Sequence, residues 1–492
     1  MAEWIECEAA LDPKRNRQSL WKRARERLLG EVWPTVTPSF QMLPGAAVFT
    51  IGSCFARNIE EHLSRLGFRI PTLALKVPRE EWRSRPNGII NKYTPAAIFQ
   101  EIDWAKKIFL NGGKIAESDS SPFLYERADG SCVDTNLAGF NPVTRERFFE
   151  RREQIYDIFK KAFGSDYVVI TLGLIEAWFD REKRIFIQET PQKLGKDFAR
   201  NPSRFAFQTL GYAQCHDLIQ TTIDSIRSIN REASFLITTS PVPLSRTFTD
   251  KDVILANTYS KSLLRTVAGD IAAANENVDY FPSYESVMLT KSWNIWEPDL
   301  LHVTDAFVGK VVARLTDVYC SGLKEADKTF LQSYIDLRDQ SLASAMELAR
   351  RAVETSPNSG QVRKHYGSLL AQKGDVKEAE LQYEKAIAFS PGDAALHYQL
   401  SAVLAGQGRL DEAISEAYRS TTLEPDNQWF HRHLGCLWLK KWKLGRATVQ
   451  FVLASSHHHL IKTKRRGVKR LIRFLLSRLE KTSRLTHSGS QA

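Results

Sequence analysis

The sequence predicts an α/β domain built on a parallel sheet, followed by an all-α solenoid of stacked helical pairs. Two observations lead to this fold class. Short apolar runs alternate with helical patterns between residues 46 and 320, as in a parallel sheet covered by helices. From residue 325 onward, small residues and prolines recur every 34 positions, which indicates repeated helical pairs. The predicted parts are an N-terminal extension (1–45), the α/β domain (46–320), the repeats (325–458) and a basic amphipathic tail (459–492).

Four apolar runs are predicted to form the strands of the sheet. They are AAVFTI (46–51), YVVITLG (167–173), SFLITTSPVP (234–243) and VDYFPSYE (278–285). Helical patterns occupy the intervening segments 55–66, 216–230 and 257–275. Ligands of such sheets bind beyond the carboxyl ends of the strands. The residues expected at those ends are Ser53, Gly173, Ser240, Pro241 and Tyr284.

Ser53 lies in GSCFA (52–56), where the first predicted strand turns directly into a helix. The free N–H groups and positive dipole of a helix N-terminus favour an oxyanion at this position. A serine nucleophile also needs a base and a residue that orients the base. Asp299 and His302, in NIWEPDLLHVTDAF (294–307), have a spacing that lets the carboxylate reach the imidazole. The alternatives are that Ser53 only caps the helix and that His302 is structural.

The stretch GSCFA, taken with other motifs, resembles the GSCFA family, a bacterial group similar to SGNH (GDSL-like) hydrolases. The resemblance extends over about 46–318, and its supporting stretches are NKYTP (91–95), TLGLIEAW (171–178), SPVPL (240–244), Ser260-Lys261-Ser262, YFPSYE (280–285) and DLLHVT (299–304). It implies an ester-cleaving or acyl-transferring site with Ser53 as nucleophile and with Asp299 and His302 as its partners. Gly173 matches the glycine of the GxND block of SGNH hydrolases.

This sequence departs from the hydrolase pattern in the GxND block. GLIE places Glu176 there, and no asparagine follows at the usual spacing. Asn91 of NKYTP is therefore a candidate for the missing amide donor. In the implied reaction His302 accepts the proton of Ser53, which attacks an ester carbonyl, while Asp299 orients His302. The N–H groups of Ser53 and Gly173, together with Asn91, are expected to stabilise the oxyanion, and water or a sugar hydroxyl then releases the acyl group.

Other residues near the predicted site allow two interpretations each. Cys54 is interpreted as a small core residue, since only one of two neighbours in a tight turn is expected to face the cleft. Glu176 and Trp178 either line a substrate pocket or cap a strand and fill the core. The remaining pairs are Arg246 and Lys261, which either hold an anionic group or lie in solvent, and Tyr93 and Tyr284, which either stack on a sugar or are buried.

The region 325–458 has a period of 34 residues, which is typical of tetratricopeptide repeats. The residues in register are Pro357, Pro391 and Pro425; Ala345, Ala379, Ala413 and Ala447; Ala349, Tyr383, Ala417 and Phe451; and Gly367, Ser401 and Gly435. Small residues let two helices approach closely, and proline ends the second helix of a pair. About three and a half units are expected. They either bind a protein or peptide partner or only extend the catalytic domain.

The positive charge of the chain is concentrated at its C-terminal end. The net charge is +11, and residues 461–492 contain ten Lys or Arg and one Glu. Because the rest is nearly neutral, no nucleic-acid partner is expected. In residues 461–484 apolar side chains follow helical spacing between the basic ones, which suits either an anionic membrane surface or a last solenoid helix. His457, His458 and His459 are interpreted as a surface loop, because no carboxylate or cysteine lies nearby.

Several classes of protein are excluded or disfavoured by the sequence. No apolar run suits a membrane span or secretory signal, and the six cysteines are scattered, so a cytoplasmic location is expected, or one peripheral to the inner membrane. No phosphate-binding glycine motif, cofactor or metal site is expected. The sequence thus favours a serine esterase or O-acyltransferase acting on an acyl ester of a glycan, lipid precursor or small donor. The alternatives are a non-catalytic scaffold that keeps this fold and binds proteins through its repeats, and a membrane-peripheral adaptor.

Overall fold

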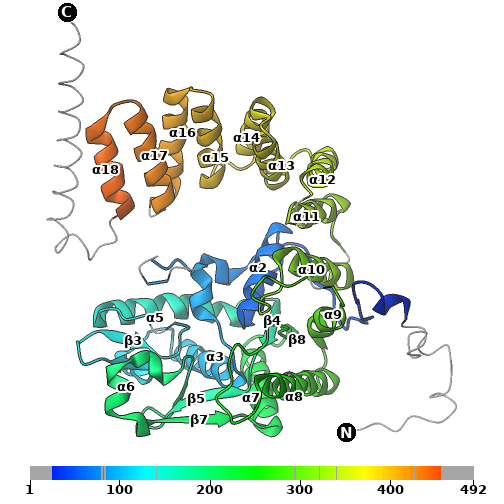
Figure 1. The fold of residues 1–492 in the computed structure, drawn as a ribbon, viewed down its shortest axis with the longest axis vertical. Helices are drawn as coiled ribbons and strands as arrows, with labels where there is room; N and C mark the ends of the chain where they lie inside the picture. Colours follow the sequence, from blue (N-terminus) through cyan, green and yellow to red (C-terminus); the bar gives the residue numbers. More distant parts are fainter. Residues whose placement is uncertain are drawn as a thin grey trace, which may run out of the picture. The chain divides into compact units, whose positions relative to one another are not determined.

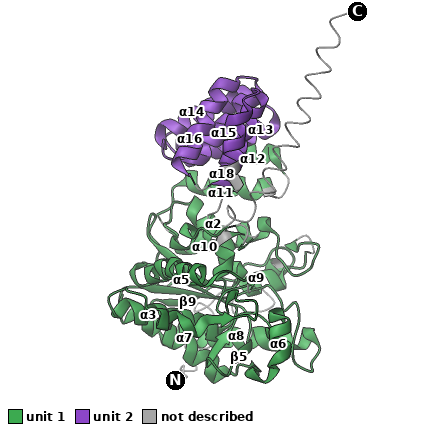
Figure 2. Ribbon diagram, turned by 90° about the vertical axis from the view of Figure 1, so that its left-hand side faces the viewer, with its two compact units in different colours: residues 1–348 green, residues 349–492 purple. Residues whose placement is uncertain are grey.

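The computed structural model describes residues 25–455, apart from residues 79–80, 83–84, 140, 293–294, 321, 339–340 and 426. The chain divides into two compact units, residues 1–348 and 349–492 (Figure 2). The predicted basic segment 461–484 and the triple histidine at 457–459 lie outside the described residues. Within the described ranges, no helix has both the length and the apolarity that crossing a membrane requires.

The described part of the first unit is built on a four-stranded parallel sheet in the order β1-β4-β8-β9 (Figure 1). The strands are β1 (Val48–Gly52), β4 (Tyr167–Leu172), β8 (Ser234–Thr239) and β9 (Val278–Tyr280). Gly52 pairs with Thr171, and Leu172 pairs with Thr239, so the carboxyl ends of three strands meet at one edge. The predicted parallel sheet is confirmed. The last two strands are shorter than predicted, because prolines follow each of them closely.

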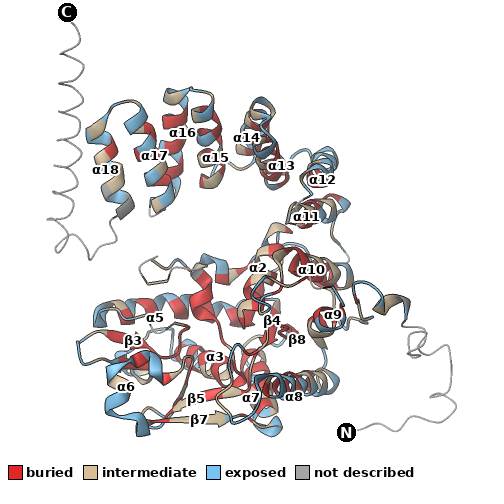
Figure 3. Ribbon diagram, viewed as in Figure 1, coloured by how far each residue is buried: buried red, intermediate tan, exposed pale blue. Residues whose placement is uncertain are grey.

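Helices cover both faces of this sheet. Alternate side chains of β1 point to opposite sides: Phe49 and Ile51 belong to one buried cluster and Val48 to the other. The first cluster is completed by α3 (Pro95–Leu110), α5 (Arg145–Phe159), α7 (Tyr212–Arg227) and α8 (Val253–Ala274), and the second by α2 (Cys54–Arg65), α9 (Ser283–Leu289) and α10 (Asp305–Tyr319). Figure 3 shows the buried residues concentrated on the strands and on the helix sides that face them.

The first unit also contains smaller elements, which the sequence pattern did not reveal. An antiparallel sheet has the order β6-β5-β7, and β2 pairs with β3. Their bounds are β2 (Leu124–Glu126), β3 (Cys132–Asp134), β5 (Glu176–Asp180), β6 (Ile185–Ile187) and β7 (Phe205–Thr209), with the short helices α4 (Glu117–Ser120) and α6 (Lys196–Arg200). These strands are three to five residues long, too short for periodicity to be informative.

The C-terminal part of the described chain is entirely helical. Its helices are α11 (Glu325–Arg338), α12 (Leu342–Thr355), α13 (Gly360–Lys373), α14 (Val376–Phe389), α15 (Ala394–Gly406), α16 (Leu410–Leu423), α17 (Gln428–Lys440) and α18 (Leu444–Ser455). The boundary between the two units falls inside α12. This run of short helices is the predicted solenoid of helical pairs.

Two sets of contacts explain why the sequence repeats every 34 residues. In two helical pairs a glycine faces an aromatic ring: a Cβ on Gly367 would lie 2.9 Å from Tyr383, and one on Gly435 would lie 3.0 Å from Phe451. In the alternate pairs a serine takes the place of the glycine and donates to a carbonyl of the facing helix. These contacts are Ser333 to Ala345 (2.5 Å) and Ser401 to Ala413 (2.6 Å).

The prolines of the repeat also have a regular partner. The carbonyl oxygen of each accepts a hydrogen bond from the side chain six residues later, on the next helix. The three contacts are Arg363 Nε to Pro357 (2.6 Å), His397 Nε2 to Pro391 (3.1 Å) and His431 Nε2 to Pro425 (2.7 Å). Each proline therefore ends one pair, and its carbonyl is satisfied by the next pair.

Candidate active site

Gly52 and Ser53 form the turn between β1 and α2. Gly52 has a φ of 137°, and a Cβ there would lie 2.2 Å from the carbonyl oxygen of Thr171, so only glycine fits. Ser53 is the N-cap residue of α2, but its side chain makes no capping hydrogen bond. Its Oγ is buried and has no hydrogen-bond partner in the described part of the chain. Capping therefore does not account for the Ser53 hydroxyl.

The backbone of Ser53 is already used by the sheet. Its N–H donates to the carbonyl oxygen of Thr171 at 3.2 Å. The expectation that this N–H contributes to an oxyanion site is therefore wrong for the structure described here. The physical reason is that the parallel ladder continues one residue beyond β1.

Gly173 lies directly beside Ser53. A Cβ on Gly173 would be 3.3 Å from Ser53 Cβ and 2.7 Å from the carbonyl oxygen of Tyr93. The neighbouring N–H of Leu174 donates to that Tyr93 oxygen at 2.8 Å. Among the described residues, the Gly173 N–H has no acceptor. It is therefore an unused backbone donor beside Ser53.

A buried cluster of charged side chains holds the NKYTP segment in place. The N–H of Lys92 donates to Gly52 O at 2.8 Å, which ties this segment to the Ser53 turn. The Lys92 ammonium lies 2.6 Å from Glu101, and Arg152 lies 2.9 Å from the same carboxylate, all fully buried. Burial alone opposes the charge on Glu101, but Arg152 and Lys92 outweigh it and hold the pKa of Glu101 below its usual value. The cluster is well paired, so it anchors the loop rigidly.

Asp299 and His302 contact each other closely on a loop before α10. Asp299 Oδ2 lies 2.6 Å from His302 Nδ1. The other oxygen accepts the backbone N–H groups of His302 (3.0 Å) and Leu301 (2.9 Å). These bonds, first the backbone and side-chain bonds from His302 and then the bond from Leu301, lower the pKa of Asp299 to about 2. The carboxylate is thus ionised and fixes the imidazole through Nδ1.

His302 lines a pocket of about 320 Å³ together with the start of α2 and the NKYTP segment. The other lining residues are Cys54, Phe55, Arg57, Asn58, Trp82, Arg85, Gly88, Asn91, Tyr93, Val242 and Val303. Asn91 Oδ1 has no partner in the described part of the chain, and its Nδ2 lies 3.5 Å from the hydroxyl of Tyr93. No hydrogen bond joins Ser53 to His302 among the described residues. The structure therefore brings His302 and Asn91 into one pocket, whose wall begins one residue after Ser53.

Comparison with known families gives two matches. The model of the GSCFA family matches residues 47–315. The chain belongs to the GSCFA family. The tetratricopeptide repeat model matches residues 330–394 and 366–427, which confirms the predicted repeats. The chain thus joins a hydrolase-like domain to a repeat module of the protein-interaction type.

Solved structures and curated proteins add little to the assignment. MamA from Desulfovibrio magneticus RS-1, residues 41 to its end, is 19% identical, with a TM-score of 0.27 over 30% of this chain and 84% of that one. MamA of AMB-1 is 19% identical, with a TM-score of 0.28 over 33% of this chain and 92% of that one. No curated protein matches the chain.

Cys54 of the GSCFA motif was expected in the core, and this expectation is wrong. The side chain is only partly buried and lines the His302 pocket. The physical reason is that Cys54 is the first residue of α2, at the helix end that borders the pocket. Burial raises the pKa of the Cys54 thiol, although Lys261 and Arg85 act in the opposite direction. The group is therefore a neutral thiol near pH 7, which is the weaker form of this nucleophile.

Glu176 and Trp178 of the GSCFA domain lie outside the His302 pocket. Glu176 accepts hydrogen bonds from Thr247 Oγ1 (2.5 Å) and from the N–H of Phe248 (2.9 Å), and it lines a separate pocket of about 250 Å³. Trp178 packs against Phe207 and Phe248, with ring centroids 5.2 and 5.1 Å apart. Both side chains thus contact the segment around Phe248: Trp178 packs among aromatic rings, and Glu176 lines a pocket other than that of His302.

Lys261 is fully buried rather than in solvent. Its Nζ donates to Gly173 O at 2.8 Å, and burial lowers the pKa of Lys261 to about 7. Its importance was not visible in the sequence, because a lysine on an amphipathic helix usually faces water. Arg246 is exposed, Tyr284 is half-buried in α9, and Tyr93 lines the pocket with its pKa raised to about 12 by burial.

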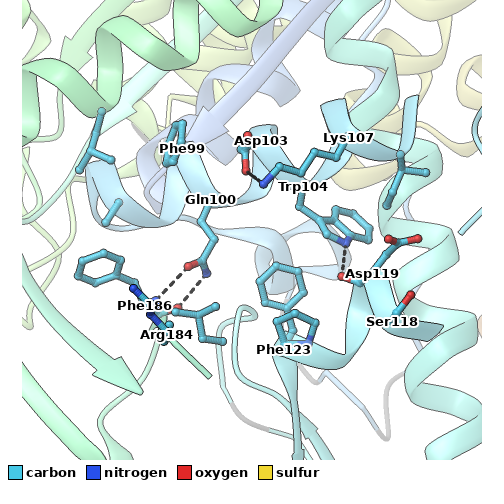
Figure 4. Close-up of a pocket in the computed structure, with 15 residues that line it drawn as sticks. Phe99, Gln100, Asp103, Trp104, Lys107, Ser118, Asp119, Phe123, Arg184 and Phe186 are labelled. Atoms are coloured by element: carbon cyan, nitrogen blue, oxygen red, sulfur yellow. Dashed lines mark hydrogen bonds and ion pairs between the residues drawn. The ribbon is translucent and has the colours of Figure 1, made fainter. Parts of the chain in front are cut away.

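A larger cavity of about 470 Å³ lies beside α3 (Figure 4). Several of its polar side chains are paired with their surroundings: Trp104 Nε1 donates to Asp119 O (3.0 Å), Gln100 donates to Phe186 O (2.9 Å), and Lys107 lies 2.6 Å from Asp103. The His302 pocket, by contrast, has unsatisfied polar atoms in its wall or directly beside it. In the described ranges, no three His, Cys, Asp or Glu side chains gather as a metal site. The smaller pocket is therefore the candidate active site.

Proposed function

We propose that the GSCFA domain is a serine esterase or O-acyltransferase that acts on an acyl ester. One observation carries this proposal: His302, held by Asp299, lines the same pocket as Cys54 at the N-terminus of α2, directly after Ser53, whose buried hydroxyl has no partner in the described chain. Unsatisfied buried hydroxyls are uncommon, and they concentrate where a reaction or ligand requires them. We therefore assign Ser53 as the nucleophile, His302 as the base and Asp299 as the orienting carboxylate.

In the proposed reaction Ser53 Oγ attacks the ester carbonyl while His302 Nε2 accepts its proton. Asp299 holds Nδ1 and stabilises the imidazolium that forms. The His302 loop is exposed, so it has room to approach Ser53, and catalytic contacts often tighten only when substrate binds. His302 then returns the proton to the leaving alcohol. Water attacks the acyl-serine in a hydrolase, and an acceptor hydroxyl attacks it in a transferase.

The oxyanion site proposed for this reaction differs from that of the typical SGNH hydrolase. The Ser53 N–H is occupied, which leaves the Gly173 N–H and the Nδ2 of Asn91 as donors. Asn91 takes the part of the missing GxND asparagine, because it lies in the pocket wall with His302. Loss of one such donor costs about 10²- to 10³-fold in rate.

The proposal extends to the setting of the enzyme. The acyl ester belongs to a glycan, a lipid precursor or a small donor, and the repeats bind a protein or peptide partner. The basic segment 461–484 contacts an anionic membrane surface, so that the protein works in the cytoplasm or at the inner membrane. The fold supports this proposal by providing a scaffold for the site and for partner binding.

Active-site labelling tests the catalytic proposal. The purified full chain is treated with a fluorophosphonate, digested and mapped by mass spectrometry. We expect an adduct on Ser53 that is lost in His302→Ala and retained in Cys54→Ala. Folded protein that gives no adduct, or an adduct on Cys54, contradicts the serine mechanism and favours the scaffold alternative or a thiol enzyme.

A further inference from the structure

We propose that the His302 pocket accepts a substrate with a compact anionic group, a carboxylate, sulfate or phosphate, held by Arg85 and Arg57. This inference rests on the proposed function for the ester part of the substrate and adds the chemical class of the remainder. The observations that support the anion, which are the cationic pocket wall and its unsatisfied donors, do not depend on whether the protein cleaves esters.

The charge of the pocket wall is one-sided. Among the described lining residues, Arg57, Arg85 and His302 carry or can carry positive charge, and no Asp or Glu is present. The carboxylates that pair with these groups are not among the lining residues: Glu60 pairs with Arg57, Glu61 with Arg85, and Asp299 with His302. The cavity is therefore lined by donors and cations, which suits a ligand with acceptor oxygens.

Arg57 is only 2% exposed and its hydrogen bonding is incomplete. Nη1 lies 2.6 Å from Glu60, and Nη2 donates to Thr50 O at 3.0 Å. The Nε donor has no acceptor within the described chain. A buried guanidinium donor without an acceptor is costly, so an acceptor from a bound ligand is favoured at this position.

Arg85 is positioned at a more open part of the same wall. Its Nε lies 3.0 Å from Glu61, its Nη1 donates to Asn58 at 2.8 Å, and its side chain is 32% exposed. Burial first, and the nearby charge of Arg85 in addition, lower the pKa of Arg57. Two like charges at one pocket repel each other, and an anion between them relieves this repulsion.

The first turn of α2 adds a third favourable contribution. α2 has 12 residues, and its N-terminal residue Cys54 lines the pocket. Unpaired N–H groups at a helix start favour an anion. Lys261 and Arg85 both favour negative charge at Cys54, although burial outweighs them for the thiol itself. For a bound anion, hydrogen bonds from the pocket wall offset the cost of burying its charge.

A matched pair of esters tests the proposal. Mono-p-nitrophenyl glutarate carries a carboxylate at the end of a five-carbon acyl chain, and p-nitrophenyl valerate lacks it. We expect the full chain to hydrolyse the glutarate ester with a kcat/KM at least about tenfold higher. Arg85→Gln should remove this preference, by lowering the glutarate rate at least about fivefold more than the valerate rate. Arg231→Gln, an exposed arginine outside the pocket, is the matched control and should change neither rate.

Equal hydrolysis of the two esters, or equal loss on both in Arg85→Gln, overturns the anion site while leaving the esterase proposal intact. Arg57→Gln is the second variant, and Arg85→Gln keeps the test decisive if the buried substitution impairs folding. A preference that survives in both variants also contradicts the proposal.

A binding measurement separates the two proposals. Ser53→Ala protein, which cannot form an acyl-enzyme, is titrated with glutarate and with inorganic sulfate by calorimetry at two salt concentrations. We expect saturable binding that weakens with salt and is lost in the Ser53→Ala, Arg85→Gln double variant. If Ser53→Ala binds the anions but the wild-type chain hydrolyses neither ester, the esterase proposal is refuted and the anion site is supported. Turnover of neutral esters with no Arg85-dependent binding refutes the anion site alone.

Discussion

The Nζ atom of Lys261 lies 2.8 Å from the carbonyl oxygen of Gly173, and the Lys261 side chain has no exposed surface. Gly173 is also the residue that contacts Ser53, so this lysine fixes the peptide beside the proposed nucleophile. A fully buried lysine is costly, and burial lowers the pKa of Lys261 to about 7. A group that reduces stability at the site of chemistry is typical of a functional compromise.

Replacement of Lys261 should separate stability from activity. The folded pKa of about 7 lies below the ordinary value of 10.5, so between these pH values the unfolded chain binds a proton that the folded chain does not. Wild-type stability should therefore rise with pH across this window, by up to about 1.4 kcal/mol per pH unit, relative to Lys261→Met. We also expect Lys261→Met to slow fluorophosphonate labelling of Ser53 at least about tenfold, because Gly173 loses its support. Melting temperatures at pH 6.5, 8 and 9.5 measure the first effect, and a pH-independent difference between the two proteins contradicts it.

Asp299→Asn should impair catalysis without unfolding the domain. The amide cannot stabilise an imidazolium, so we expect ester hydrolysis to fall by about 10²- to 10⁴-fold. The pKa of about 2 means that Asp299 stays ionised above about pH 3, and its contribution is lost only as the pH falls through 2. Glu297→Gln removes the same charge from the same loop and serves as the control. If both variants lose activity equally, the effect is one of loop charge and not of the Asp299–His302 bond.

Gly173→Ala should displace Ser53. The new Cβ would lie 2.7 Å from Tyr93 O and 3.3 Å from Ser53 Cβ, so one of these backbone segments must move. We expect a loss of about 1–3 kcal/mol of stability together with loss of Ser53 labelling. Gly211→Ala is a matched control, because its Cβ meets nothing within 4 Å. Labelling at the wild-type rate in Gly173→Ala would show that this glycine does not position the nucleophile.

The helical repeats offer a test of size complementarity. Gly367→Ser would place its Cβ 2.9 Å from Tyr383, whereas Ser401 occupies the same repeat position opposite Ala417. We expect Gly367→Ser to cost about 1–3 kcal/mol and Tyr383→Ala to cost about 3–5 kcal/mol. The double variant reproduces the serine–alanine pairing, so it should be more stable than the sum of the two losses predicts. Simple additivity in a thermal or denaturant double-mutant cycle would contradict this pairing.

The parts of this protein that were predictable from sequence depend on short-range order. Single strands and helices and the Asp299–His302 spacing are readable from short stretches, and the 34-residue period is readable because it recurs along the chain. The Asp299–His302 contact was predictable because the two residues are three positions apart, and a local loop is enough to bring them together. The small strands β5, β6 and β7 were missed, since five residues or fewer carry no reliable period.

By itself, the sequence determined the fold class, the repeats and which residues could act as nucleophile and base. Only the tertiary structure decided which side chains share the pocket: Cys54 and Arg85 line it, Glu176 does not, and Lys261 is buried beneath Gly173. Lys261 and Gly173 are 88 positions apart, so no local pattern encodes their contact. Their meeting depends on how β4 and α8 pack on the sheet, because burial and electrostatic environment arise only when distant segments close around one another.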